Sequence, residues 1–272
     1  MYIKLVSDLH LEFNRTATHD MFCPPVLYCM PADTDKETIL VLAGDIGSLN
    51  NLAQLKSFLL QKCDQYHSVV YVPGNHEFYG TSIQEGCEAL NILRSLRDNL
   101  YILSAGRPGV VIGQYVFFGD TMWSQVSSKT YQFSRYLNDY HLIKVSKRNQ
   151  KRITPRYTSF LHTRQRMMIE KAVTEFGSNP RKLKKVLVSH HGPSPVSDHP
   201  DFFGSDLKEF FHNTELSESQ VKFYSMFDLI LHGHTHRCQD VVDPLTGVRT
   251  VANCVGYYAE RTDYKENLLL SL

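Results

Sequence analysis

Residues 2–10, YIKLVSDLH, decide how this chain folds and where its polar chemistry gathers. Tyr2–Val6 is a short β-branched and aliphatic run, which predicts a buried strand. Asp8 and His10 follow it directly, and side chains two positions apart on an extended segment point the same way. The stretch therefore predicts a strand whose carboxyl end presents a carboxylate and an imidazole together.

Similar runs recur along the chain and alternate with segments of helical periodicity. They predict strands at 39–43, 69–72, 110–112, 115–118, 186–189, 229–231, 248–252 and 268–270. The spacing of apolar residues predicts helices over 52–62, 83–96, 157–176 and 217–226. This alternation indicates an α/β fold, with a mostly parallel sheet early in the chain and a hairpin-rich second half.

The composition is that of a folded globular chain of 272 residues, 42% hydrophobic and 21% charged. Lysine and arginine total 29 against 28 acidic residues, and the net charge of +1 argues against a dedicated nucleic-acid or anionic-membrane binder. No apolar run is long enough for a membrane span or signal peptide, and the six cysteines form no C-x-x-C pair. We therefore expect a cytoplasmic protein with reduced thiols, folded as a single domain over 1–272.

Four more predicted strands end in side chains of the kinds that bind metals. These strand ends are Gly44-Asp45, residues 73–77 (PGNHE), His190-His191 and residues 232–236 (HGHTH). In open α/β sheets, functional groups gather outside the carboxyl ends of the strands. We therefore expect these segments to converge in space although they are far apart in sequence.

The candidate metal ligands are carboxylate, amide and imidazole groups without a thiolate: Asp8, His10, Asp45, Asn75, His190, His234 and His236. This donor set favours Mn²⁺, with Fe, Zn²⁺, Ni²⁺ or Mg²⁺ as alternatives. The set exceeds what one four- to six-coordinate ion takes, so the sequence predicts two divalent ions.

The five segments occur in the order D-x-H, G-D, G-N-H-E, H-H and G-H-x-H, from Asp8 to His236. In this order they resemble the motif set of the calcineurin-like metallophosphoesterase superfamily. The D-L-H-L-E-F opening at residues 8–13 resembles its bacterial and phage-type branch. Residues 253–257 (NCVGY) resemble that branch's N-P-R-G-Y segment without its Pro and Arg. The resemblance implies a four-layer αββα fold, in which helices flank a two-sheet β-sandwich and a dinuclear metal site lies at the strand carboxyl ends.

The resemblance also implies how the ligands divide between the two ions. One ion would be held by Asp8, His10 and His236, and the other by Asn75, His190 and His234, with Asp45 bridging them. A carboxylate is the candidate side chain with two negative oxygens to span two cations, which agrees with a bridging Asp45.

Other residues of the same segments are expected to act beside the metals. His76 resembles the family's catalytic histidine, and we expect it to protonate the leaving oxygen. Asn75 is also expected to contact the substrate. His191 is interpreted either as a phosphate contact or as a residue that supports its neighbouring ligand by hydrogen bonding or packing. Glu12 and Glu77 are interpreted as supporting partners rather than catalytic groups.

The activity implied by the resemblance is hydrolysis of a phosphoester by a hydroxide held between two metal ions. Ser/Thr protein phosphatases continue G-D-x-V-D-R-G at the bridging aspartate, whereas here Asp45 is followed by residues 46–50, IGSLN. Arginine clamps a dianionic phosphate, so its absence favours a phosphodiester or small phosphoryl substrate, such as a nucleotide or a nucleic-acid-derived ester. A phosphomonoesterase, a protein phosphatase and a metal-binding interaction module are the alternatives.

Two irregular segments are candidate walls of the site. Residues 123–160 are expected to form a flap or cap insertion, and residues 191–206 form a Pro- and Gly-rich loop. The basic run 144–156 is interpreted as a solvated face. The alternative is that it lines a substrate groove with the aromatic side chains Tyr131, Phe133, Tyr136 and Tyr140.

Overall fold

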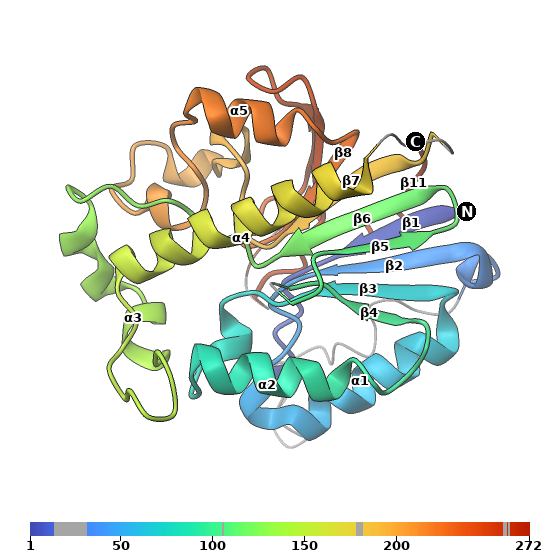
Figure 1. Ribbon diagram of the computed structural model, residues 1–272, viewed down its shortest axis with the longest axis horizontal. Coiled ribbons are helices and arrows are strands. Elements are labelled where there is room, and N and C mark those ends of the chain that lie inside the picture. Colours follow the sequence, from blue (N-terminus) through green and yellow to red (C-terminus); the bar gives the residue numbers. More distant parts are fainter. Residues whose placement is uncertain (14–31, 105, 178–181, 258–259, 261) are drawn as a thin grey trace.

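Two mixed sheets packed face to face form the centre of this computed structural model, which describes residues 1–13, 32–104, 106–177, 182–257, 260 and 262–272 (Figure 1). Within those residues, the first sheet has the strand order β11-β1-β2-β3-β4 and the second the order β5-β6-β7-β8-β10-β9. The strands of the first sheet are β1 Tyr2–Val6, β2 Thr38–Ala43, β3 Ser68–Val72, β4 Leu100–Ile102 and β11 Leu269–Leu270. Those of the second are β5 Gly109–Ile112, β6 Tyr115–Asp120, β7 Lys184–Ser189, β8 Leu229–His232, β9 Gln239–Val242 and β10 Arg249–Ala252.

Helices cover the outer face of each sheet (Figure 1). The first sheet is covered by α1 Leu52–Gln65 and α2 Ile83–Leu93, and the second by α4 Pro155–Phe176 and α5 Glu218–Tyr224. Hydroxyl groups of Ser82, Thr154 and Ser217 cap the amino ends of α2, α4 and α5. The four-layer αββα sandwich implied by the resemblance is therefore confirmed. Among the helices of the described residues, none has the length and apolar composition needed to cross a membrane.

Short helical turns occupy many of the connections. They are α3 Asp139–Leu142 and the 3₁₀ turns Leu11–Phe13, Asp35–Glu37, Leu49–Asn51, His76–Phe78, Tyr131–Tyr136, Pro195–Ser197, Pro200–Phe202 and Lys208–Phe210. Several of these turns follow strand carboxyl ends, where the predicted ligands lie.

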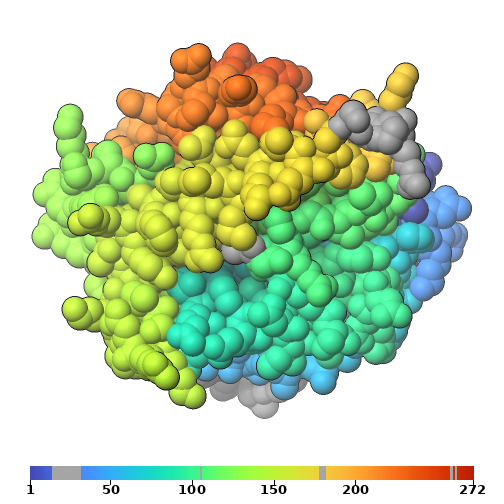
Figure 2. Space-filling view, in the orientation of Figure 1, coloured from blue at the N-terminus to red at the C-terminus, as the bar shows by residue number. Residues whose placement is uncertain are grey.

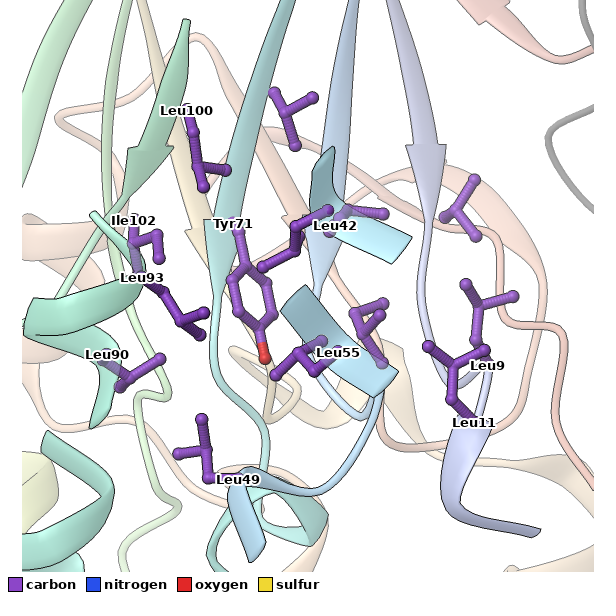
Figure 3. Packing of buried hydrophobic residues seen from close by; sticks show 14 of the residues in the cluster. Leu9, Leu11, Leu42, Leu49, Leu55, Tyr71, Leu90, Leu93, Leu100 and Ile102 are labelled. Atoms are coloured by element: carbon purple, nitrogen blue, oxygen red, sulfur yellow. The ribbon is translucent and has the colours of Figure 1, made fainter. Parts of the chain in front are cut away.

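The strands are apolar on both faces because both faces are covered. Between the sheets, residues such as Leu5 and Val41 share one buried cluster with Phe117 and Val188 of the second sheet. The outer face of the first sheet packs a second cluster against α1 and α2, in which Tyr71 lies among leucine side chains (Figure 3). The sheets are thus a rigid base for the segments that leave them.

Parallel registers bring the predicted strand ends to one edge of the molecule. In the first sheet β1, β2 and β3 are parallel, with Val6 opposite Leu42, and in the second sheet β7, β8 and β10 are parallel. An isolated parallel bridge between Ser7 and Cys254 joins the two sheets at this edge. Figure 1 shows both chain termini at the opposite edge.

The second half of the chain is not hairpin-rich, which corrects the sequence-based expectation. Strands β6, β7, β8 and β10 all run parallel, and antiparallel pairs occur only at the edges, with β5 and β9. The parallel arrangement follows from the crossovers through α4 and α5. Strands β4 and β9 were not predicted, because β4 has three residues and β9 (QDVV) has only two apolar ones.

The expected insertion at 123–160 contains the turn Tyr131–Tyr136 and α3, but α4 already begins at Pro155. This segment lies against α2, where a bridge pairs Ser82 with Lys144 (Figure 2). A role as a movable flap stays a prediction.

Candidate active site

The first group of candidate ligands lies at the carboxyl end of β1 and after β8. The Nε2 atom of His236 lies 3.4 Å from Asp8 Oδ1 and 3.3 Å from His10 Nε2. Each of the three side chains offers one ligand atom, and these atoms lie within 4.8 Å of one another. Asp8 is fully buried and also accepts a hydrogen bond from the Ser7 hydroxyl. This group can hold one metal ion.

The second group joins the ends of β2, β7 and β8. Asp45, His190 and His234 offer ligand atoms within 4.8 Å of one another, and Asp45 Oδ1 lies 3.3 Å from His190 Nε2. Asn75 adds an amide oxygen, whose distance to His190 Nε2 is 3.0 Å. Because the Ala43 carbonyl oxygen can only accept, the bond of 2.8 Å from His190 Nδ1 leaves Nε2 unprotonated in the neutral ring. His190 therefore presents Nε2 as its ligand atom.

Backbone strain marks the same positions. Positive φ angles occur at five predicted ligands: Asp8 (57°), His10 (49°), Asp45 (52°), His234 (68°) and His236 (49°). Such a conformation costs a non-glycine residue on the order of 1–3 kcal/mol and is typical of ligand clamps held by the surrounding structure. At Gly74, a Cβ would lie 2.1 Å from Asp45 Oδ1, so only glycine allows this loop to approach the carboxylate.

Glu77 ties the loops after β2 and β3 together. Its carboxylate accepts hydrogen bonds from the N–H groups of Asp45, Ile46 and Gly74 at 3.0, 2.8 and 2.7 Å. The Tyr71 hydroxyl donates a further bond of 2.7 Å, and Figure 3 shows this hydroxyl beside Leu55. Burial and the charge of Asp45 raise the pKa of Glu77 to about 7. The geometry is that of a supporting residue, as the sequence indicated.

Glu12 connects the first ligand group to the predicted acid. Its Oε1 atom lies 2.9 Å from His76 Nδ1 and 3.3 Å from His10 Nδ1. Because a carboxylate only accepts, both Nδ1 atoms donate to it, and the Nε2 atoms face away from Glu12. His76 Nε2 lies 3.3 Å from the Tyr257 hydroxyl and 4.0 Å from Asp45 Oδ2. Glu12 thus orients one predicted metal ligand and the predicted acid with a single oxygen.

Asp139 of α3 orients Asn75 from the inserted segment. Its Oδ1 atom accepts hydrogen bonds from Asn75 Nδ2 at 2.8 Å and from the Tyr79 hydroxyl at 2.7 Å. With its amide nitrogen engaged, Asn75 directs its oxygen at the ligand group. The Tyr79 ring also stacks on His76, with ring centroids 4.1 Å apart. The insertion therefore contributes to the site itself.

Opposite charges control the titration of the ligand groups. Burial would raise the pKa of Asp45, but the charge of His190 and neighbouring imidazoles holds it well below its ordinary value. Burial would lower the pKa of His190, yet Asp45 raises it to about 9. Burial would also lower the pKa of His236, but its hydrogen bonds to Asp8 and Glu260 raise it to about 10. The buried carboxylates need cationic partners, a demand that divalent ions also meet.

The donor chemistry of the two groups fits two divalent cations. Each group has a buried carboxylate and imidazole nitrogens, neither contains a thiolate, and Asn75 supplies a neutral oxygen to the second. Asp45 belongs to the second group, and His10 of the first group is among the imidazoles that lower its pKa. That Asp45 bridges two ions stays a prediction.

His191 lies beneath the ligands. It is fully buried, its ring packs 4.1 Å from that of His234 and 5.0 Å from that of Trp123, and its Nδ1 atom has no hydrogen-bond partner. It does not line the cavity described next. Of the two interpretations left open by the sequence, this geometry favours packing over a phosphate contact.

A cavity of about 330 Å³ opens from the ligand groups between the insertion and the loop after β7. Its described lining includes the ligands Asp45, Asn75, His234 and His236. The remaining lining residues are His76, Tyr79, Tyr136, Leu137, Asn138, Asp139, Asp198, His199, Phe202, Ser205, Leu207, Lys208, Phe210, Phe211, His212, Thr235, Tyr257 and Glu260. The loop at 191–206 is therefore a wall of the site, as expected.

The basic run 144–156 contributes nothing to this lining, and Lys147, Arg148, Lys151 and Arg152 are exposed. Of the aromatic residues proposed to line a groove with it, only Tyr136 lies at the cavity. The structure therefore favours the solvated-face interpretation.

Several site residues were missed by the sequence analysis. Tyr257 contacts His76 and stacks on His10 with ring centroids 4.5 Å apart, and Glu260 is hydrogen-bonded to His236. Tyr257 ends the NCVGY segment, which was a usable signal. Glu260 lies in no recognised motif, and its contact with His236 on another loop is seen only in the folded chain.

Comparisons with known proteins agree with the fold. A family model described as calcineurin-like phosphoesterase matches residues 1–238. An uncharacterized protein of Acanthamoeba polyphaga mimivirus is 27% identical in an alignment covering 96% of this chain and 93% of that protein.

Two solved structures share the architecture. A phosphopantetheinyl hydrolase from Mycobacterium tuberculosis has a TM-score of 0.68 at 15% identity, over 94% of this chain and 90% of that one. A dimetal phosphatase from Danio rerio has a TM-score of 0.51 at 16% identity, over 92% of this chain and 86% of that one. At these identities the likeness is one of fold.

Proposed function

This chain belongs to the calcineurin-like phosphoesterase family and is a hydrolase of phosphoric esters; we propose that it cleaves a phosphodiester with two divalent ions, Mn²⁺ foremost. The observation that carries this proposal is the pair of ligand groups at the strand ends, of which the second contains Asp45, a residue that lines the cavity. We propose that Asp45 bridges the two ions. We propose that Asp8, His10 and His236 hold one ion and that Asn75, His190 and His234 hold the other. Their bound ions would lower the pKa of a water and neutralise phosphate oxygens.

His76 is proposed as the general acid. It lines the cavity without belonging to either proposed ligand set. Its Nδ1 donates to Glu12, so protonated His76 carries its transferable proton on Nε2. Burial would lower the pKa of His76, but the charges of Asp45 and Glu12 raise it above its ordinary value. A histidine held protonated in this way can give its Nε2 proton to the leaving oxygen.

The charge of the cavity supports a diester over a monoester. Within the described lining, Lys208 is the only lysine or arginine. Arg237, next to His236, donates hydrogen bonds to the carbonyl oxygens of Val196 and Asp198. A dianionic monoester is typically clamped by arginine in a bidentate pair, whereas a monoanionic diester has less charge to neutralise. A nucleotide or nucleic-acid-derived ester has this chemistry.

The test compares kcat/KM for bis-p-nitrophenyl phosphate and p-nitrophenyl phosphate, using protein stripped by a chelator and reloaded with Mn²⁺. We expect the diester to be preferred, and activity to be absent without metal. The Asp45→Asn variant, purified identically, measures any contaminating activity. A clear preference for the monoester would refute the diester proposal.

A further inference from the structure

Large aromatic side chains stand exposed at the mouth of the cavity. Tyr136, at the end of the Tyr131–Tyr136 turn, is 62% exposed, and Phe202, at the end of the Pro200–Phe202 turn, is 61% exposed. Both line the cavity, and neither belongs to a core cluster. Because burying a phenylalanine side chain would contribute about 1.5–3 kcal/mol, such exposure at a site suggests a ligand that covers the rings.

Neighbouring side chains hold these two rings in place. The Arg135 guanidinium lies 4.8 Å from the centroid of the Tyr136 ring, and its Nη2 atom donates to the Tyr136 hydroxyl at 2.8 Å. The Phe202 ring contacts that of His199, with centroids 5.3 Å apart. Side chains oriented in this way bind a ligand at a lower entropic cost than free ones.

Apolar surface continues from these rings to the ligand groups. Leu137, Leu207, Phe210 and Phe211 also line the cavity. The Phe211 ring stacks on His234, a proposed metal ligand, with centroids 4.9 Å apart and an interplanar angle of 24°. We call Tyr136, Leu137, Phe202, Leu207, Phe210 and Phe211 the aromatic wall.

We propose that the aromatic wall binds a planar aromatic group on the ester arm that stays with the phosphate, so that the substrates are phosphodiesters of a nucleoside. This inference rests on the proposed function. Flat aromatic side chains recognise flat rings by stacking. The cavity, at about 330 Å³, is at the small end of ligand pockets and suits one ring system rather than a long acyl chain. Lys208 adds a positive charge at the wall.

The experiment varies one ester arm while the leaving group stays the same. It compares kcat/KM for thymidine 5′-(p-nitrophenyl phosphate), methyl p-nitrophenyl phosphate and decyl p-nitrophenyl phosphate with Mn²⁺-loaded protein. We expect kcat/KM for the nucleoside ester to exceed that for the methyl ester by about tenfold or more. This factor corresponds to the stacking of one base on an aromatic side chain. Phe202→Ala and Tyr136→Ala should each lower this ratio about fivefold.

Phe203→Ala is the matched control. Phe203 neighbours Phe202 and is 68% exposed, but it does not line the cavity, so the ratio should stay that of the unmodified protein. A nucleoside-to-methyl ratio near one, with the methyl ester well hydrolysed, would contradict base binding by the aromatic wall. The proposed phosphodiesterase activity would then still hold. Preference for the decyl ester would also contradict base binding by the wall.

Binding provides a readout independent of turnover. If none of the esters is hydrolysed, the proposed function has failed, and calorimetry of thymidine 5′-monophosphate against methyl phosphate still tests the wall. Tighter binding of the nucleotide that weakens in Phe202→Ala but not in Phe203→Ala supports the wall. Equal binding of the two phosphates contradicts it.

Discussion

The strand-end metal centre and the aromatic wall lie in one cavity but are built in different ways. At the centre, Asp8 and Asp45 are buried, have positive φ angles and lie on loops that leave parallel strands. At the wall, Tyr136 and Phe202 are exposed and stand on short turns outside the sheets. We therefore propose that the sheets position the reacting groups, whereas the connecting segments determine which ester is accepted. Substitutions at the centre should therefore lower kcat, and substitutions at the wall should raise KM.

Asp45→Asn should have the largest effect. Replacing the proposed bridging carboxylate should weaken the binding of both ions, and metal ions contribute several kcal/mol of transition-state stabilisation. We expect kcat to fall by about 10⁴-fold, with loss of bound metal. Steady-state kinetics and elemental analysis of the same preparation measure both. A variant that keeps two ions per chain and full turnover would show that Asp45 bridges nothing.

His76→Asn should come next. It removes the proposed proton donor but no proposed metal ligand, so metal content should be unchanged while kcat on an alkyl diester falls by about 10²-fold or more. The defect should shrink on p-nitrophenyl esters, because p-nitrophenolate leaves without a proton. An equal fall in kcat on alkyl and aryl esters would show that His76 does not act by protonating the leaving oxygen.

Glu12→Gln should be milder. Glutamine keeps the oxygen that accepts from both rings but removes its negative charge, so both hydrogen bonds weaken and His10 and His76 lose part of their orientation. We expect kcat to fall about tenfold at unchanged KM. If kcat stayed constant and only KM rose, Glu12 would act on substrate binding instead of on the two histidines.

Lys208→Ala should have the smallest effect and the opposite kinetic signature. Lys208 lines the cavity but lies in neither ligand group, so KM for an anionic diester should rise about threefold at constant kcat. The comparison between centre and wall would break down if this substitution lowered kcat as strongly as His76→Asn.

The sequence predicted the convergence of the strand-end residues better than it predicted the wall, for a physical reason. Asp8 and His10 follow a strand with period-two spacing, and parallel strands bring their carboxyl ends together, so local patterns were sufficient. Asp139, which orients Asn75 from 64 residues away, and Phe202 have no local signal of their own. Their positions depend on how irregular segments pack.

The fold shows the same division. The helices and most strands follow from apolar periodicity and side-chain caps such as Ser217. The parallel order of the second sheet was missed because strand direction is set by the crossovers α4 and α5 and not by the strand sequences. Strand β9 (QDVV) was missed because an exposed edge strand need not be apolar.

Metal content with single-ligand variants tests the central claim most directly. Elemental analysis of Mn²⁺-reconstituted protein should give two ions per chain, and His236→Ala and His234→Ala, which each remove a ligand from a different group, should each give about one ion and little diester hydrolysis. One ion or none in the unmodified protein, with activity that survives chelation, would contradict a two-metal centre built on these strand ends.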